Sequence, residues 1–179
     1  MGNFNVRTTD DEQWLTPPEI IKALGKFDLD PCSPVNRPWD TATTHYNKLM
    51  DGLNHEWKGR VWLNPPYGKE TFKWVKKLSE HGDGIALIFA RTETKGFHEY
   101  VWNKADGIFF FKGRLSFYDV KGNKRNTAPA PSCLVVYGRR NRISINFAVY
   151  KKRLTGKFIS LNNGGYDNEL FKRDYEGSI

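Results

Sequence analysis

Two consecutive prolines directly after an apolar segment constrain this 179-residue chain more than any other feature. Residues 59 to 63 have the composition of a strand, and the sequence continues Asn64-Pro65-Pro66-Tyr67. Proline cannot donate a hydrogen bond to a sheet and fixes its own φ, so the strand has to end at Asn64 and leave in a defined direction. Because ligands of open α/β sheets bind at the carboxyl ends of strands, we expect Asn64 and Tyr67 at a ligand site.

The groups at this turn suit a flat aromatic amine. Asn64 has a side-chain carbonyl, and a strand that stops at prolines leaves the main-chain carbonyls of Asn64 and Pro65 without ladder partners. Two acceptors that bind both N–H groups of an aromatic amine draw its nitrogen toward sp3 geometry and localise its lone pair. The Tyr67 ring can stack on the heterocycle. The amine then becomes nucleophilic without a strong base.

The pattern of apolar segments predicts an α/β fold. We expect helices over residues 17 to 25, 69 to 78 and 94 to 103, and a short helix within 41 to 47. Thr16 is expected to cap the first of them. We expect strands over residues 27 to 30, 59 to 63, 84 to 90, 107 to 112, 115 to 118, 132 to 137 and 143 to 149. The last three strands have no helices between them, which predicts a mostly parallel sheet with antiparallel strands late in the chain.

Length and composition indicate a single domain over residues 1 to 179. The chain is 39% hydrophobic and 15% aromatic, which argues against disorder, and no Pro-rich or Ser-rich linker divides it. Residues 151 to 179 have weak periodicity and are interpreted as a basic, partly mobile tail without chemistry.

Charge and composition also limit the partners and the compartment. Lys and Arg number 28 against 20 Asp and Glu, and the net charge of +8 favours a polyanionic partner over ordinary solubility charge. Cys32 and Cys133 lack CxxC spacing and the first residues are polar, which favours a reduced cytoplasm. The longest apolar runs are too short for a membrane span of about 20 residues. The four histidines lack metal-ligand spacing, so no metal site is expected.

Seven segments of the chain occur in a characteristic order. They are Trp14-Leu15-Thr16-Pro17-Pro18-Glu19-Ile20, Phe27-Asp28-Leu29-Asp30-Pro31-Cys32-Ser33, Asp51-Gly52-Leu53, Trp57-Lys58-Gly59-Arg60-Val61, Asn64-Pro65-Pro66-Tyr67-Gly68, Gly113-Arg114-Leu115-Ser116-Phe117 and Ala130-Pro131-Ser132-Cys133-Leu134-Val135-Val136. This series resembles the short DNA N6-adenine methyltransferases of phages and prophages, the Dam-like family. The resemblance spans about residues 12 to 137 and is far more specific than Asn-Pro-Pro-Tyr, which guanine and glutamine N-methyltransferases share.

The resemblance implies a reduced Rossmann-like methyltransferase fold that takes its methyl group from S-adenosylmethionine. The substrate would be the exocyclic amine of an adenine flipped out of double-stranded DNA. Asn64, Pro65, Pro66 and Tyr67 would form the catalytic motif. No oligomeric state follows from the resemblance.

Six residues match the positions at which the family binds its cofactor: Thr16, Pro17, Asp30, Pro31, Cys32 and Asp51. Thr16 lies in the segment that touches the carboxylate and methionine end, where free N–H groups of a helix start suit an anion. The loop after Asp30 lacks the usual glycine-rich turn, so Asp30 is open between an amine contact, a ribose contact and a solvated carboxylate. Asp51 resembles the residue that receives the adenine amine of the cofactor, although Asp-Gly is also common in turns.

Six further residues are candidates for DNA contact: Arg91, Arg114, Phe117, Lys121, Lys124 and Arg125. Phe117 could close on the flipped base opposite Tyr67, although a strand phenylalanine is more often part of a core. Arg114 could meet a phosphate or a guanine edge. The others are proposed from charge and loop position, and each alone is more often a solvated surface charge.

Three alternative functions stay open. The motif also fits an N-methyltransferase that acts on RNA or on protein glutamine. The basic charge fits a DNA-binding protein without catalysis. Asp51, Glu56 and Lys58 superficially match a magnesium-dependent nuclease, in which the Asn-Pro-Pro-Tyr segment would have no purpose.

Overall fold

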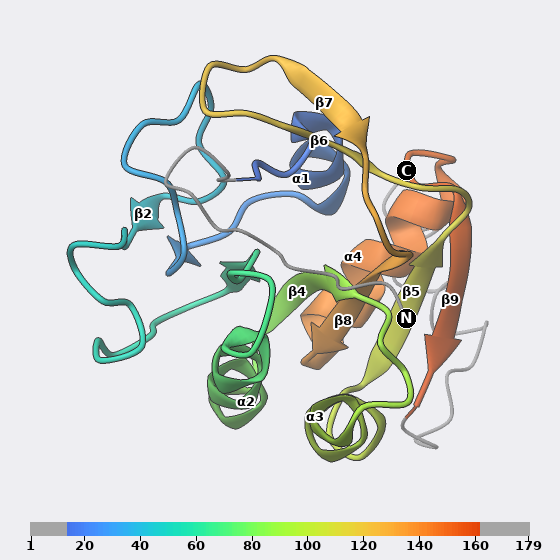
Figure 1. Ribbon diagram of the computed structural model, residues 1–179. Coiled ribbons are helices and arrows are strands. Elements are labelled where there is room, and N and C mark those ends of the chain that lie inside the picture. The colour runs from blue at the N-terminus through green and yellow to red at the C-terminus, as the bar shows by residue number, and fades with distance from the viewer. Residues whose placement is uncertain (1–13, 162–179) are drawn as a thin grey trace, which may run out of the picture.

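The computed structural model describes residues 14 to 161 and shows a mixed sheet between two layers of helices (Figure 1). Within this range seven strands are hydrogen-bonded in the order β2-β1-β3-β4-β8-β5-β9. Their bounds are β1 Leu29–Asp30, β2 Thr44–His45, β3 Val61–Leu63, β4 Gly84–Phe89, β5 Gly107–Phe111, β8 Ser132–Tyr137 and β9 Gly156–Ser160. A separate hairpin pairs β6 (Ser116–Tyr118) with β7 (Lys124–Thr127).

The sheet is parallel on one side and antiparallel on the other. β2, β1, β3 and β4 pair in parallel, whereas β8 is antiparallel to both β4 and β5, and β9 is antiparallel to β5. The expected α/β class with antiparallel strands late in the chain is therefore confirmed. The parallel part is smaller than predicted, because half of the six strand pairs are antiparallel.

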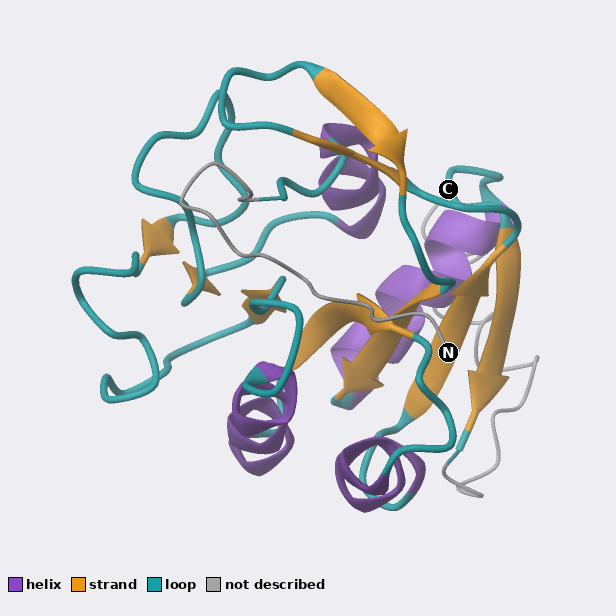
Figure 2. Ribbon diagram, viewed as in Figure 1, coloured by secondary structure: helices purple, strands orange, loops and turns teal. Residues whose placement is uncertain are grey.

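Helices lie on both faces of the sheet (Figure 2), and a hydrophobic core lies between the sheet and the helices on each face. Helices α1 (Pro18–Leu24) and α4 (Arg139–Tyr150) cover one face, and α2 (Thr71–His81) and α3 (Lys95–Phe97) cover the other, where a π-helical turn His98–Trp102 continues α3. Successive strand residues alternate between the cores: Trp62 points to the α1 side, whereas Val61 and Leu63 point to the α2 side. Each fully buried side chain of this kind contributes about 1.5 to 3 kcal/mol.

A buried arginine at the amino end of β3 joins three elements. Arg60 donates from Nη1 to the carbonyls of Leu24 and Lys26 at 2.9 Å, from Nε to Asn141 Oδ1 at 2.6 Å and from Nη2 to Ser144 Oγ at 2.7 Å. Burial lowers its pKa to about 10, and its hydrogen bonds compensate the buried charge. Arg60 therefore fixes α1 and α4 to the sheet, at the edge opposite the carboxyl ends of the parallel strands.

Two predicted elements are wrong. Residues 143 to 149 belong to helix α4 rather than to a strand. Their apolar residues alternate along the sequence, but the side chains that α4 buries are Asn141, Ile145 and Ala148, which are spaced as one helical face. Residues 41 to 47 contain strand β2 instead of a short helix, because the chain there pairs in parallel with β1.

Two segments predicted as loop or tail are partly strand. Residues 124 to 127 form β7, and residues 156 to 160 form β9 at the sheet edge. Both strands are largely exposed, so their sequences lack the alternation that marks a half-buried strand. The rest of the predicted tail, from residue 162 onward, lies outside the described residues.

Candidate active site

The carboxyl ends of β1 and β3 meet where the direction of the sheet order changes. From β1 the chain passes to β2, which lies on one side of β1, and it later enters β3, which lies on the other side of β1. Ligands of open α/β sheets bind at such switch points. Asp30 ends β1, Asn64 directly follows β3, and Phe89 ends β4, the next parallel strand. The sequence motif therefore lies at the position where a ligand site is expected.

The proline turn has a fixed shape. β3 ends at Leu63, as the prolines predict, and Pro65 is buried. The Thr71 hydroxyl at the start of α2 donates to the Pro66 carbonyl at 2.7 Å and accepts from the Gly68 N–H at 3.0 Å. These contacts occupy the Pro66 carbonyl. Within the described residues no hydrogen bond reaches the Pro65 carbonyl, which remains available to a ligand.

The orientation of the Asn64 amide follows from its partners. Nδ2 donates to the Trp14 carbonyl at 2.7 Å, and a carbonyl can only accept, so the NH2 group must lie on that side. Oδ1 therefore points the other way, where the Tyr67 hydroxyl approaches it at 3.3 Å. The amide thus keeps its oxygen as an acceptor, one residue before the Pro65 carbonyl in the chain. Two acceptors suit an exocyclic amine, which has two N–H groups.

Four aromatic rings surround the acceptors. Tyr67 stacks on Phe89 at a centroid distance of 4.1 Å, and Phe117 meets Tyr67 edge-on at 6.0 Å. Trp14 in turn packs edge-on against Phe117 at 5.3 Å. Burial raises the pKa of Tyr67 far above its ordinary value, so its hydroxyl stays protonated. Since Phe117 is fully buried and edge-on, its contact with a substrate base stays a prediction.

The segment before α1 contains a buried hydroxyl. Thr16 is 2% exposed, and its Oγ1 has no hydrogen-bond partner among the described residues. The prediction that Thr16 caps α1 is wrong: Pro17, also buried, is at the N-cap, and no side chain caps the helix. The neighbouring Leu15 pairs with Tyr118 of β6 through two main-chain hydrogen bonds, which fixes the segment. A buried hydroxyl without a partner destabilises the fold unless a bound ligand forms a hydrogen bond with it.

Asp30 is a buried carboxylate on the same edge. It accepts from the Cys32 N–H at 3.0 Å through Oδ1 and from the Thr41 hydroxyl through Oδ2. Burial raises its pKa to about 6, although both hydrogen bonds and the charge of Arg37 act in the opposite direction. Asp30 is thus ionised at neutral pH, and its carboxylate oxygens can accept further hydrogen bonds. Cys32 is a free thiol whose pKa burial raises well above its ordinary value.

The loop of Asp51 lies against the loop of Pro31. A Cβ on Gly52 would lie 2.2 Å from the Pro31 carbonyl oxygen, so only glycine permits this approach. Asp51 itself is exposed, has φ of 49° and accepts from Asn54 Nδ2 at 2.7 Å through Oδ2. The structure places it near the Pro31 loop, and its cofactor contact stays a prediction.

Comparison with known proteins identifies the family. The model of the family described as DNA N-6-adenine-methyltransferase (Dam) matches residues 3 to 157. The chain belongs to the Dam family. A search of the curated proteins and a search of the solved structures gave no match. The family match spans the acceptor pair, the β6-β7 hairpin and helix α4.

The predicted DNA contacts of this Dam-family chain lie at two places on the carboxyl edge. Arg91 follows β4 and is exposed. The others belong to the hairpin or to the segment before it: Lys121 and Lys124 are exposed, Arg125 is half-buried, and the exposed Arg114 donates to the Ala128 carbonyl at 3.2 Å.

The tip of the hairpin is tightly ordered. Asp119 Oδ1 accepts from the N–H groups of Lys121 and Asn123, both at 2.9 Å. Gly122 has φ of 83°, which completes the turn. The tip also packs on the loop over residues 35 to 40, where Trp39 meets Tyr118 edge-on at 5.3 Å. The hairpin is therefore a rigid two-stranded ribbon at its base and at its tip.

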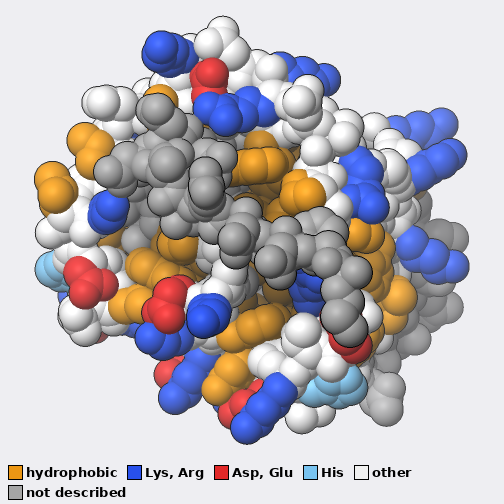
Figure 3. All heavy atoms as spheres, viewed as in Figure 1, with side chains coloured by type: hydrophobic (Ala, Val, Ile, Leu, Met, Phe, Trp, Pro, Cys, Tyr) orange, Lys and Arg blue, Asp and Glu red, His pale blue; other side chains and the backbone are white. Residues whose placement is uncertain are grey.

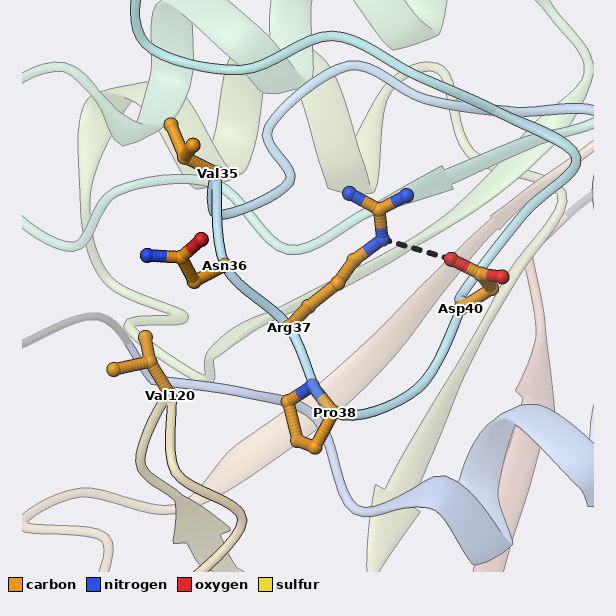
Figure 4. Close-up of a pocket in the computed structure, with 6 residues that line it drawn as sticks. All are labelled: Val35, Asn36, Arg37, Pro38, Asp40 and Val120. Atoms are coloured by element: carbon orange, nitrogen blue, oxygen red, sulfur yellow. Dashed lines mark hydrogen bonds and ion pairs between the residues drawn. The ribbon is translucent and has the colours of Figure 1, made fainter.

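Beside this contact, an open hollow of about 410 Å³ lies between the loop and Val120 of the hairpin (Figure 4). Its lining residues are Val35, Asn36, Arg37, Pro38, Asp40 and Val120. Arg37 donates to Asp40 at 2.9 Å and contacts His45 Nδ1 at 3.1 Å. Because the same loop leads to Thr41, this pairing supports the hydroxyl that binds Asp30. The Asn-Pro-Pro-Tyr motif does not line the hollow.

Sequence reasoning missed three contributions to the site. Phe89 could have been anticipated, because it ends the strand parallel to β3. The Trp14 carbonyl carried no signal, since any residue has a carbonyl. The role of Thr41 was missed because the sequence predicted a short helix within residues 41 to 47. Of the nuclease pattern, the exposed Glu56 and Lys58 pair with each other at 3.1 Å, and Asp51 accepts from Asn54.

Residues 14 to 161 contain no group of three or more His, Cys, Asp and Glu side chains placed to hold a metal ion. Over the same residues, none of the helices has the length and apolar character needed to cross a membrane.

Proposed function

We propose that this protein transfers a methyl group from S-adenosylmethionine to the exocyclic amine of an adenine flipped out of double-stranded DNA. Membership of the Dam family gives the reaction class. The single observation that carries the proposal for this chain is the oriented amide of Asn64, followed in the chain by the Pro65 carbonyl, which accepts no hydrogen bond within residues 14 to 161. The mixed sheet with its switch point supports a Rossmann-like methyltransferase fold.

The residues at the carboxyl edge fit the cofactor. The Thr16 hydroxyl, unpartnered and buried, would donate to the carboxylate of the methionine moiety. The buried Asp30 would accept from its amine or from its ribose hydroxyls. Pro17, Pro31, Cys32 and Asp51 would line the same space. When bound, the cofactor supplies an electrophilic methyl group on a sulfonium.

The catalytic motif would act by holding the amine. Asn64 Oδ1 and the Pro65 carbonyl accept its two N–H bonds, which localises the lone pair on nitrogen. Tyr67, supported by Phe89, offers its free face to the adenine ring. Positioning of this kind can contribute about 7 to 11 kcal/mol to lowering the barrier. The cost of flipping the base is only a few kcal/mol.

The reaction would need no strong base. The amine becomes cationic as it gains the methyl group and then loses a proton readily. Tyr67 does not serve as that base, because burial raises its pKa and keeps its hydroxyl protonated. The Asn64 carbonyl is an acceptor at every pH, so the rate should not depend on the titration of this motif.

The hairpin would place the DNA. A two-stranded ribbon fits the major groove, and Lys121 and Lys124 stand exposed on it. Phosphate contacts through Arg91, Arg114 and Arg125 would set the register without reading sequence. Phe117 lies in β6, so the same hairpin connects the DNA side with the aromatic cluster around Tyr67.

Transfer of a labelled methyl group to a panel of substrates tests the proposal. The panel contains unmethylated double-stranded DNA, RNA and a glutamine peptide, with product analysis for N6-methyladenine. We expect label in the DNA alone. Label in RNA or peptide would assign the chain to another amine substrate, and binding of DNA without transfer would make it a non-catalytic binder. Cleavage of the DNA that depends on magnesium would support the alternative function of a nuclease.

A further inference from the structure

We propose that the segment over residues 151 to 157 forms a second phosphate-binding surface for DNA that flanks the target adenine. This inference rests on the proposed DNA substrate. The surface consists of the exposed side chains Lys112, Lys151, Lys152, Arg153 and Lys157. We call it the flank surface.

Within residues 107 to 161, which include the flank surface, basic residues far outnumber acidic ones. From residue 107 to residue 161 the sequence contains twelve Lys and Arg residues and a single acidic residue, Asp119. Asp119 is engaged in the hairpin tip. Among the described residues, no carboxylate forms an ion pair with Lys112, Lys152 or Lys157. A positive surface of this kind suits a polyanion.

The backbone holds these side chains in place. The Arg153 N–H donates to the Ala148 carbonyl at 2.8 Å, and the Lys112 N–H donates to the Thr155 carbonyl at 2.9 Å. Leu154 is buried between them with 6% exposure. The backbone of the segment is therefore part of the folded structure and is fixed relative to the sheet.

The flank surface lies on the same edge as the active site. Because β9 runs antiparallel to β5, the start of β9 lies beside Phe111 at the carboxyl end of β5. In Figure 3, Lys and Arg side chains gather along the upper rim of the molecule, over the hairpin, and continue to the upper right, where α4 ends and β9 begins. The basic side chains of the hairpin and of the flank surface thus lie along the same rim of the molecule.

The distance between Asn64 and the flank surface determines which phosphates of the DNA the flank surface would contact. The sheet order places β9 four strands from β3, which carries Asn64. At about 4.8 Å between neighbouring strands, the flank surface lies about 20 Å from the acceptors. Since DNA rises about 3.4 Å per base pair, this corresponds to phosphates about six base pairs from the target. The contact should therefore exist on one side of the adenine only.

Binding of duplexes with different flanks tests the inference. The variant is Lys151→Gln/Lys152→Gln/Arg153→Gln, and its control is Lys22→Gln/Lys26→Gln/Lys104→Gln, which removes the same charge from exposed positions away from this edge. Wild-type protein should bind more tightly when one flank grows from about 3 to about 10 base pairs, and growth of the other flank should matter less. The variant should lose this gain, and the control should keep it.

Salt titration gives the second measurement. Each lost phosphate contact lowers the salt slope by about 0.9, so the variant should differ by about 2 to 3 and bind the long duplex about 10- to 100-fold more weakly at 0.15 M salt. Equal slopes for variant and control, or an unchanged gain from the longer flank, would overturn the inference. Thermal melting establishes that both variants are folded. Absence of methyl transfer by wild-type protein would count against the proposed function instead, because flank binding is measured without catalysis.

Discussion

At the scale of single residues, the Asn64 side chain is held by one residue that precedes it in the sequence and by one that follows it. The Trp14 carbonyl accepts from Nδ2 and the Tyr67 hydroxyl approaches Oδ1, so the amide is already oriented before a substrate binds. Such orientation before binding lowers the entropic cost of reaching the reactive geometry. Thr16 and Asp30 differ from Asn64 in one respect: each is buried at some cost in stability, which a bound cofactor would offset.

Thr16→Val should separate binding from stability. Valine has the same shape but no hydroxyl, so it removes a buried group that lacks a partner. The free energy of unfolding without cofactor should stay the same or rise by about 1 kcal/mol. Affinity for S-adenosylmethionine should fall about tenfold or more, as measured by calorimetry. Thr16→Ser should restore most of it, and an undiminished affinity in Thr16→Val would remove Thr16 from the site.

Asp30 should make stability depend on pH. Burial raises its pKa in the folded protein to about 6, above the unfolded value near 4, so the folded state binds more protons between these limits. The free energy of unfolding therefore falls as pH rises from about 4 to about 6. Relative to wild type, Asp30→Asn should gain about 2 kcal/mol between pH 4.5 and pH 8. Urea unfolding at both pH values measures this, and a difference that does not change with pH contradicts it.

At the scale of elements, the edge opposite the site supplies rigidity. Arg60 connects the end of α1, the start of α4 and the sheet through charge-assisted hydrogen bonds, and it also lies 4.2 Å above the Phe27 ring. The active-site edge has loops and a hairpin instead. Stability and function are thus placed at opposite ends of the same strands.

Arg60→Met should be strongly destabilising. It leaves the Leu24 and Lys26 carbonyls and Asn141 without their buried donor, which should cost about 3 to 5 kcal/mol. Arg140→Met is the control, since it breaks only surface ion pairs, with Asp83 and Asp28, and should cost less than about 1 kcal/mol. Urea unfolding compares the two. Similar losses in both variants would contradict the role assigned to Arg60.

Elements with strong local signals could be predicted from the sequence. The prolines mark the end of β3, and Gly82, with φ of 78°, ends α2 three residues beyond the predicted end. Helix α4 could not be predicted, because its buried face includes Asn141, which is polar and is buried only through its hydrogen bonds to Arg60, Asp83 and Tyr137. That face exists only in the folded chain, whereas the alternation of residues 143 to 149 is visible in the sequence.

At the scale of the whole molecule, the chain concentrates chemistry and positive charge on one edge of the sheet. The end of β3 and the turn at Asn64 could be predicted, because they depend on the local geometry of the two prolines. The Trp14 contact and the flank surface could not, because they depend on which distant segments the fold brings to that edge. Segments far apart in sequence, from residue 14 to residue 157, meet there (Figure 1).

The rate of methyl transfer in a single turnover by Asn64→Ala tests the central claim most directly. Alanine removes the oriented acceptor but leaves Thr16 and Asp30 in place. We expect the rate with saturating DNA and cofactor to fall at least about 100-fold, a loss comparable to that of one preorganised hydrogen-bonding group, while cofactor affinity stays within about threefold of wild type. Asn146→Ala on α4 should transfer at the wild-type rate. A rate for Asn64→Ala within tenfold of wild type would contradict the claim that this amide holds the target amine.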